Sequence, residues 1–463
     1  MNVLHFICLA TGVLLAAVIY RQYQQLAAPL AVPNIEFYEY WGPGDGQNYK
    51  ESDKIEPFQI SYDEHVIKRL RSKLEDVPHL AEPLEGVAFE YGFNSVHLKE
   101  ILEYWRTSYL DRWDQREKFL NQYPQFKTQI QGLDIHFLHV RPPKVNNPKR
   151  RVPLLMLHGW PGSVREFYEI IPKLTTRSDE YEYVFELVIP SLPGYGFSQA
   201  AARPGLSAAK IAVIMHNLMS KLGFHEYYVH AGDWGAVIGS LMGAFFPKNV
   251  LGVHLTMCVN LSPLASMKNI IGGFIPNCVV ENEAHIPYYF PQMDKFKTLL
   301  AETGYMHLQS TKPDTIGIAL TGNPIGLAAY ILEKFSVWTN PSYLSLADGG
   351  LYKYFDRDAL LDNVMIYYLT DSITTSQRLY KEYFSGEAIK NQYDRVPIKV
   401  PAACAKFRYE LMHQTDWALR DRFQNLVQSN HFDDGGHFAA LQLPDVLYRD
   451  IFEFVNRFYK RGF

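Results

Sequence analysis

The sequence Ala231-Gly232-Asp233-Trp234-Gly235 constrains the fold of this chain more than any other stretch. It follows an apolar run at 227–230 and precedes a helix-like run at 236–242. Small residues around one central residue are typical of a sharp strand–turn–helix elbow that exposes the central side chain. That residue is Asp233, and no Gly-x-Ser-x-Gly occurs in the chain. The pattern predicts a nucleophilic carboxylate. The alternative is an aspartate that only caps a helix.

An aspartate at an elbow implies a particular chemistry. A carboxylate that attacks a saturated carbon forms an ester, and a positioned base can hydrolyse that ester at its carbonyl and restore the acid. A serine at the same place would form an ether, which water does not readily cleave. We therefore expect a displacement at a saturated carbon, as in an epoxide or an alkyl halide.

Two glycine-containing segments are predicted to complete the site. His158-Gly159-Trp160-Pro161-Gly162 follows the apolar run 152–157. A tight turn after a core strand can aim backbone N–H groups at a developing oxyanion. His437 follows two glycines near the end of the chain. It comes last in the order nucleophile, acid, histidine, which predicts that it is the base.

A carboxylate is expected between the elbow and the histidine, where it would orient the imidazole. Glu410 is the favoured candidate because it follows the strand-like stretch 400–407. Asp416, Asp433 and Asp434 remain open alternatives by pattern alone.

Alternating strand and helix patterns from residue 152 onward predict an α/β fold with a mostly parallel sheet. The alternation stops after residue 256. Residues 260 to about 391 show helical patterns only, and the strand pattern resumes at 397. This arrangement predicts a helical lid over the elbow. The predicted divisions are a membrane anchor at 1–21, an N-terminal meander with helices that wrap the core at 22–124, the first part of the core at 125–258, the lid at 259–395 and the second part of the core at 396–463.

The N-terminal segment predicts a membrane anchor. Residues 3–20 are apolar apart from His5 and Thr11, and Arg21 follows. This length is close to that needed to cross a bilayer. No Lys or Arg precedes the run, which argues against the alternative of a cleaved signal peptide. Arg21 favours a cytosolic catalytic domain.

Composition excludes several other classes. The net charge is −4 and there is no basic run, so we expect no nucleic-acid partner. The four cysteines, Cys8, Cys258, Cys278 and Cys404, show no metal-ligand spacing. We expect reduced thiols, no disulfide and no zinc site.

Several long segments resemble the microsomal epoxide hydrolases, and within them the insect juvenile hormone epoxide hydrolases. The resemblance extends over essentially the whole chain. The matching segments are Trp41-Gly42-Pro43-Gly44, the turn at 158–162, Gly232-Asp233-Trp234-Gly235, Gly304-Tyr305-Met306-His307, Lys312-Pro313-Asp314-Thr315, the stretch 327–334 and the stretch 435–440.

The resemblance implies an α/β-hydrolase fold at the endoplasmic reticulum membrane, an apolar epoxide substrate and no cofactor or metal. It implies that Asp233 is the nucleophile, His437 the base and Glu410 the acid. Two lid tyrosines, Tyr305 and Tyr380, would donate hydrogen bonds to the epoxide oxygen, a role that composition cannot reveal among 31 tyrosines. The backbone N–H groups of Trp160 and Trp234 would hold the oxyanion.

Two other functions remain open. A haloalkane dehalogenase would share the aspartate elbow and the histidine, and the Trp234 ring would serve as its halide donor. A carrier of apolar ligands would share the fold without needing the catalytic set. The preferred epoxide, a juvenile hormone or a xenobiotic, is not decided by the sequence.

Overall fold

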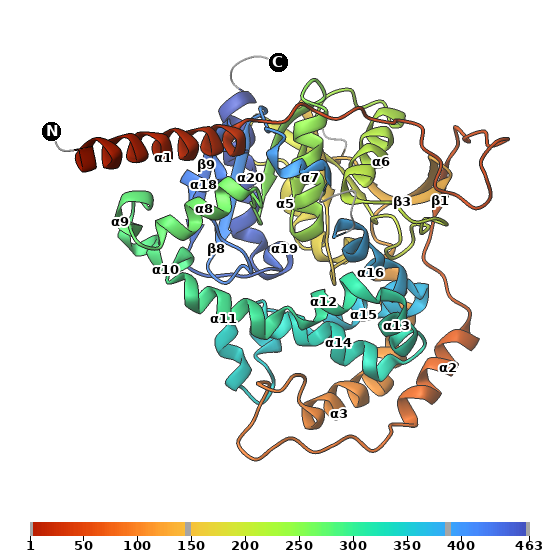
Figure 1. Cartoon of the computed structure of the whole chain (residues 1–463). Helices are drawn as coiled ribbons and strands as arrows, with labels where there is room; N and C mark the ends of the chain where they lie inside the picture. The colour runs from red at the N-terminus through yellow and green to blue at the C-terminus, as the bar shows by residue number, and fades with distance from the viewer. Residues whose placement is uncertain (1–2, 144–149, 385–389, 460–463) are drawn as a thin grey trace.

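One mixed sheet runs through the molecule (Figure 1). The computed structural model describes residues 3–143, 150–384 and 390–459. Within them the sheet has the strand order β1-β2-β3-β5-β4-β6-β7-β8-β9. The strands are β1 Ile55–Phe58, β2 Gln125–Ile130, β3 Leu133–Val140, β4 Arg150–Leu157, β5 Tyr183–Pro190, β6 Tyr227–Ala231, β7 Val250–Leu255, β8 Ala402–Phe407 and β9 Leu426–Phe432.

The strand pairing changes once across the sheet, from antiparallel to parallel. Strands β1, β2, β3 and β5 pair antiparallel in that order, and the pairings from β5 through β4, β6, β7 and β8 to β9 are parallel. This is the α/β architecture that the alternation predicts. Strand β1 was missed, because Pro57 in a four-residue run argues against a strand unless it lies at an edge, which is where β1 pairs.

Helices cover both faces of the sheet (Figure 1). A Cβ atom added to Gly252 of β7 would lie 2.8 Å from the Phe454 ring, whereas the next residue, Val253, lies against Gly243. Because successive residues of a strand face opposite sides, the helices that carry Phe454 and Gly243 lie on opposite faces. The helices of these two layers are α5 Ile171–Thr175, α6 Ala208–Lys221, α7 Asp233–Phe245, α18 Asp416–Leu419, α19 Ala439–Gln442 and α20 Pro444–Tyr459.

A helical insertion separates β7 from β8, as the lid prediction requires. Its helices are α8 Pro263–Gly272, α9 Pro276–Val279, α10 Ile286–Tyr289, α11 Gln292–Glu302, α12 Gly304–Thr311, α13 Pro313–Leu320, α14 Pro324–Val337, α15 Arg357–Thr370 and α16 Ser372–Tyr383. In Figure 1 its helices α11 to α15 lie below the sheet, whereas α9 and α10 lie to the left of it.

The N-terminal part begins with α1, Val3–Ala27, and continues after β1 with α2, Glu64–Glu75. Apolar residues at helical spacing between 95 and 119 predict one helix there. The structure divides this stretch into α3 Ser95–Tyr104, a π-helical turn at 105–109, a 3₁₀ turn at 110–112 and α4 Trp113–Leu120. The break brings the Tyr109 hydroxyl to the buried Asp362 at 2.8 Å. A tertiary hydrogen bond therefore accompanies the irregular turns, which periodicity alone cannot predict.

Among the residues whose side chains the structure describes, no single helix is both long enough and apolar enough to cross a bilayer. The helices α13 and α14, which are bent by 118° relative to each other, are together long and apolar enough.

The expectation of reduced thiols is wrong for one pair of cysteines. Cys258 and Cys404 form a disulfide with their Cα atoms 5.8 Å apart. They are 146 residues apart in sequence, and only the parallel pairing of β7 with β8, which sets Leu255 opposite Cys404, brings them together. Cys278 is free and exposed.

A buried ion cluster joins the N-terminal part, the core and the lid. Asp362 of α15 is fully buried. Its carboxylate accepts hydrogen bonds from Arg165 at 2.8 Å, Arg116 at 2.5 Å and Tyr109 at 2.8 Å. Arg165 belongs to the core and Arg116 to α4, so one lid carboxylate binds both other parts of the molecule.

We expect Asp362→Asn to lower the free energy of unfolding by about 3–5 kcal/mol, because it removes the buried carboxylate shared by Arg165 and Arg116. Each arginine then keeps only a more exposed partner, Glu169 or Asp358. Glu64→Gln removes the exposed pair with Lys68 and serves as the control, with a loss below about 1 kcal/mol. Urea unfolding of the purified enzymes measures both values. Equal losses would show that the cluster does not hold the three parts together.

Candidate active site

The predicted elbow is present between β6 and α7. Asp233 has a positive φ of 48°, a conformation that a non-glycine residue adopts rarely and at a cost. The neighbouring backbone leaves no room for side chains. A Cβ atom at Gly159 would lie 2.1 Å from the Asp233 carboxylate, and one at Gly235 would lie 2.3 Å from the Leu157 carbonyl. The small residues of both motifs therefore permit the close approach of the turn at 158–162 to the carboxylate.

Both carboxylate oxygens of Asp233 have partners. The Trp160 backbone N–H donates to Oδ1 at 2.7 Å. Oδ2 lies 3.3 Å from Nε2 of His437. Asp233 is also the first residue of α7, where the helix dipole favours a negative charge. The adjacent Trp234 is the second residue of that helix, so its N–H group belongs to the same positive end.

The other ring nitrogen of His437 contacts the predicted acid. Nδ1 of His437 lies 2.7 Å from Oε1 of Glu410, and both side chains are buried. The alternative Asp416 is bound instead by Lys406 at 2.6 Å, and Asp434 accepts from Tyr354. Glu410 therefore contacts the ring nitrogen of His437 that faces away from Asp233.

Two carboxylates control the protonation of His437. Burial alone would lower the pKa of the imidazole, but Glu410 and Asp233 outweigh burial and raise the pKa well above its usual range. The free enzyme therefore holds a protonated imidazole against Asp233. Esterification of Asp233 would remove one of the two negative charges, so the pKa of His437 would fall at the step where a base is needed.

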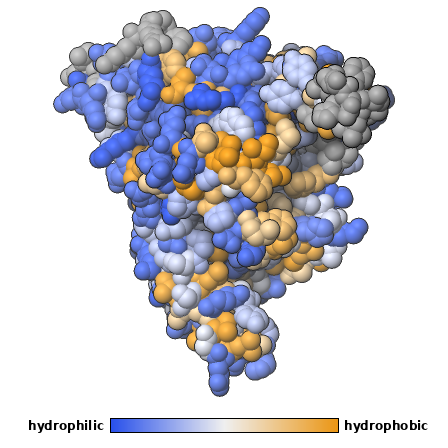
Figure 2. All heavy atoms as spheres, turned by 60° about the vertical axis from the view of Figure 1, so that its left-hand side comes forward, coloured by the Kyte–Doolittle hydropathy of each residue, from blue (hydrophilic) through white to orange (hydrophobic). Residues whose placement is uncertain are grey.

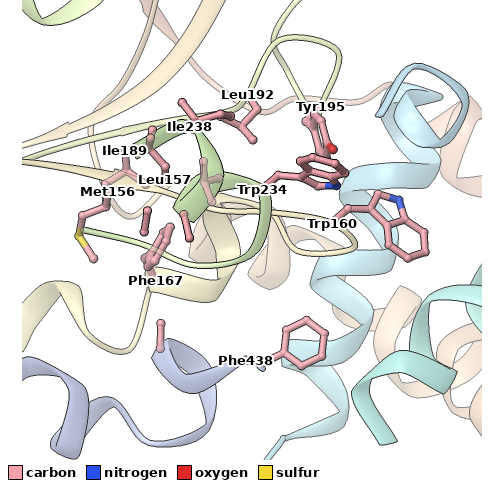
Figure 3. Packing of buried hydrophobic residues seen from close by; sticks show 14 of the residues in the cluster. Met156, Leu157, Trp160, Phe167, Ile189, Leu192, Tyr195, Trp234, Ile238 and Phe438 are labelled. Carbon is pink, nitrogen blue, oxygen red and sulfur yellow. The ribbon is translucent and has the colours of Figure 1, made fainter. Parts of the chain in front are cut away.

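The lid brings both predicted tyrosines to the elbow. The Tyr305 ring from α12 stacks on Trp160, with centroids 5.2 Å apart and an interplanar angle of 9°. The Tyr380 ring from α16 meets Trp234 edge to face at 4.7 Å. The two phenol rings are 5.9 Å apart. Figure 3 shows Trp160, Trp234 and Tyr195 gathered on one side of the core cluster.

The environment keeps both phenols protonated. Burial, and then the charge of Asp233, raises the pKa of Tyr305 far above neutrality. Burial, followed by the neighbouring Tyr305 and Asp233, does the same for the pKa of Tyr380. No described residue forms a hydrogen bond of good geometry with the Tyr380 hydroxyl. The hydroxyl lies close to Tyr305 and Trp234, both of which influence the pKa values of this pair of phenols.

The structure also reveals a carboxyl group that the sequence analysis missed. Glu166 folds back over the turn, so that a Cβ atom at Gly162 would lie 2.3 Å from its Oε2. Burial raises the pKa of Glu166 to about 8; His437 lowers it and Asp233 raises it further. No spacing rule distinguishes this glutamate from a solvated one, so only the folded turn identifies it as part of the site.

We expect Glu166→Gln to change how stability depends on pH. The pKa of Glu166 is higher in the folded protein than in the unfolded chain, so its contribution to stability is complete below about pH 4.5 and is lost as the pH rises to 8. The glutamine variant lacks this loss. Its unfolding free energy relative to wild type should rise between pH 5 and pH 8.5, on the order of 2 kcal/mol. Parallel stability curves for the two proteins would contradict the assignment.

All seven residues predicted for the site converge at the carboxyl-terminal edge of the parallel strands. Within the described residues, no group of three or more His, Cys, Asp or Glu could hold a metal ion. The fold and the arrangement of carboxylate, histidine and second carboxylate define a hydrolase of the α/β class with an aspartate in the place of the usual serine.

Comparison with known proteins identifies the family. Residues 55–167 match the family described as "Epoxide hydrolase N terminus", and residues 152–273 match the alpha/beta hydrolase fold. The chain is 53% identical to juvenile hormone epoxide hydrolase 1 of Ctenocephalides felis over 94% of this chain and 92% of that one. It is 43% identical to epoxide hydrolase 1 of Oryctolagus cuniculus, with 90% and 92% covered.

Solved structures of epoxide hydrolases support the same family assignment. The crystal structure of juvenile hormone epoxide hydrolase from the silkworm Bombyx mori superposes with a TM-score of 0.90 at 47% identity, covering 93% of this chain and 100% of that one. The Aspergillus niger epoxide hydrolase gives a TM-score of 0.69 at 28% identity, with 88% and 97% covered. The chain belongs to the epoxide hydrolase family.

Proposed function

We propose that this enzyme converts apolar epoxides to vicinal diols through an ester on Asp233. The observation that carries the proposal is a carboxylate held between the Trp160 N–H and His437, beside two protonated phenols. A nucleophile, a base and two acids thus surround one small space. The nucleophile and the acids are needed to open the epoxide ring, and the base is needed to hydrolyse the resulting ester.

In the first step Asp233 attacks one epoxide carbon, and the bond from that carbon to the ring oxygen breaks. The oxygen gains negative charge and takes a proton from Tyr305 or Tyr380, while the other phenol donates a hydrogen bond. Donors held where charge develops lower the barrier by about 3 kcal/mol each. The products are a hydroxyalkyl ester on Asp233 and one phenolate.

In the second step water attacks the ester carbonyl. Once the ester has removed the charge of Asp233, His437 passes its proton through solvent to the phenolate. The neutral imidazole then accepts the proton of the attacking water, and Glu410 stabilises the resulting imidazolium. The backbone N–H groups of Trp160 and Trp234 hold the tetrahedral oxyanion. Its collapse releases the diol and restores the ionised Asp233 beside a protonated His437, which is the starting state.

We expect His437→Gln to separate the two steps. The ester forms with Asp233 and the tyrosines alone, whereas its hydrolysis requires the base. Mass spectrometry should therefore find the variant heavier by one substrate molecule, and Asp233→Asn, which lacks the nucleophile, serves as the control without adduct. An inactive, unmodified His437→Gln enzyme would mean that the histidine is needed already in the first step.

We expect Tyr305→Phe and Tyr380→Phe each to slow ester formation by about 10²–10³-fold, because one phenol remains. The double variant has no acid and should be nearly inactive, while substrate binding changes little because the rings remain. Single-turnover kinetics with a chromogenic epoxide separates the two effects. A double variant that reacts near the wild-type rate would remove both tyrosines from the mechanism.

The substrate class follows from the aromatic site and from the relatives. Two tryptophans and two tyrosines surround the carboxylate, which favours an apolar epoxide. Relatives from Ctenocephalides felis and Bombyx mori are named juvenile hormone epoxide hydrolases. We infer that juvenile hormone is a substrate and that xenobiotic epoxides are also accepted. Relative kcat/KM values for a panel of epoxides that includes juvenile hormone test this, and equal values throughout would argue against a hormone-specific enzyme.

One observation favours testing the alternative function, that of a haloalkane dehalogenase. The indole N–H group of Trp160 is buried and has no hydrogen-bond partner among the described residues, and halide ions bind to such donors. Chloride release from a chloroalkane series is the decisive measurement. Release at rates similar to epoxide opening would broaden the proposed function, and saturable binding of epoxides without turnover would favour a carrier instead.

We propose that residues 3–20 anchor the enzyme once in the endoplasmic reticulum membrane with its catalytic domain in the cytosol. The apolar length and Arg21 support this orientation. The disulfide is instead typical of oxidising compartments such as the lumen. Protease digestion of intact microsomes distinguishes the two sides, because a luminal domain would survive.

A further inference from the structure

The lid carries an exposed apolar surface that the catalytic mechanism does not use. It lies where α8 ends, and its members Ile270 and Phe274 have exposed fractions of 62% and 84%. Met293 and Phe296 of α11 are similarly exposed, at 62% and 54%. We call the group of exposed apolar residues at the end of α8 and the start of α11 the apolar tip: Ile270, Ile271, Phe274, Ile275, Met293 and Phe296.

The two parts of the apolar tip form one surface. A Cβ atom at Gly273 would lie 3.3 Å from the Gln292 side chain, and the Gln292 amide donates to the Asn269 carbonyl at 3.3 Å. The end of α8 and the start of α11 are therefore in contact. Figure 2 shows apolar side chains gathered near the middle of the face that contains this part of the molecule. A contiguous apolar surface of this kind marks an interaction site.

The helix α1 lies beside this surface. It packs against α8, and both α1 and α9 project from the same side of the molecule (Figure 1). Arg395 fixes the carboxyl end of α1 by donating to the carbonyls of Gln25 and Ala28 at 2.6 and 2.9 Å. Residues 13, 14, 15 and 18 of α1 are all apolar and more than half exposed. A helix that is apolar around most of its circumference requires lipid or a partner.

A cavity of about 340 Å³ opens at the base of α8, next to the end of α1. Leu261, Tyr383 and Arg395 contribute to its wall. Arg395 also binds α1, and Tyr383 packs on Trp234 with ring centroids 5.0 Å apart. The cavity therefore lies between the surroundings of α1 and the aromatic wall of the active site, and Tyr383 separates it from that wall.

We propose that the apolar tip inserts into the interfacial region of the same bilayer that α1 enters, so that an apolar epoxide passes from the lipid into the cavity at the base of α8. The inference rests on the proposed anchor and on the proposed epoxide chemistry. The occupant is lipid because the tip continues the exposed apolar surface of α1, and because substrates of this class partition into membranes. Insertion also positions α11, which ends at Glu302 directly before the helix that carries Tyr305.

A label on the native Cys278 reports on the position of the tip. Cys278 lies in α9 and is exposed, whereas Cys258 and Cys404 are bonded to each other. The full chain with Cys8→Ser is labelled with a thiol-reactive fluorophore and reconstituted in phosphatidylcholine vesicles. The matched control, Cys8→Ser with Cys278→Ser and Tyr91→Cys, carries the label on a distant residue that is 82% exposed.

Nitroxide-labelled acyl chains should quench the Cys278 label at least twofold and leave the control unquenched, while aqueous iodide should do the reverse. A Cys278 label as accessible to iodide as the control would overturn the proposal, although flotation with vesicles would still support the anchor. If the enzyme does not float with the vesicles, both the insertion of the tip and the membrane anchor are rejected. Diol formation in detergent, measured in parallel, tests the epoxide chemistry independently of these results.

A substitution in the tip tests the route. Ile270→Asp combined with Phe274→Asp should abolish nitroxide quenching and raise KM for an epoxide dissolved in vesicles by about five- to tenfold, with kcat in detergent unchanged. Ile318→Asp, on an exposed lid position outside the tip, is the control. An unchanged KM in vesicles would overturn the route. Shielding from iodide that persists in detergent and grows with protein concentration would mean that a second copy of the chain covers the tip, and would overturn the bilayer proposal.

Discussion

The contact between His437 and Asp233 depends on the parallel strands of the sheet, from β6 to the edge strand β9. Asp233 follows β6, Glu410 follows β8 and His437 follows β9. Because parallel strands end at the same edge of a sheet, these three side chains meet although more than 200 residues of sequence separate the first from the last. The distances of 3.3 Å and 2.7 Å along this chain of side chains are therefore set by the register of the sheet. The positive φ of Asp233 then raises its carboxylate clear of that edge.

The acids of the proposed reaction come from a different part of the chain and reach the same point by other interactions. Tyr305 and Tyr380 lie on helices of the lid, where they pack against the aromatic rings that adjoin the nucleophile. Asp362 holds the lid to Arg165, which follows the turn at 158–162. Lid and core are therefore linked by a buried ion cluster as well as by aromatic contacts, and the phenols are held in place before any substrate arrives.

Local sequence predicts the elbow because its requirements are local: small residues must flank a strained turn, and Gly159 and Gly235 meet backbone or carboxylate where a side chain would lie. Resemblance alone indicated Tyr305 and Tyr380, since tyrosine is too common in this chain to mark a site. Glu166 and the Cys258–Cys404 bond escaped prediction because each depends on contacts that form only after folding.

The insertion of the lid between two paired strands has a consequence for how such enzymes diversify. Strands β7 and β8 pair directly with each other, and the bond between Cys258 and Cys404 closes the insertion at its base. The sheet, and with it the aspartate, histidine and glutamate, is complete without the intervening helices. Selection can therefore alter the lid to admit new substrates while the hydrolytic centre stays unchanged, provided that two phenols and one buried carboxylate are kept in their places.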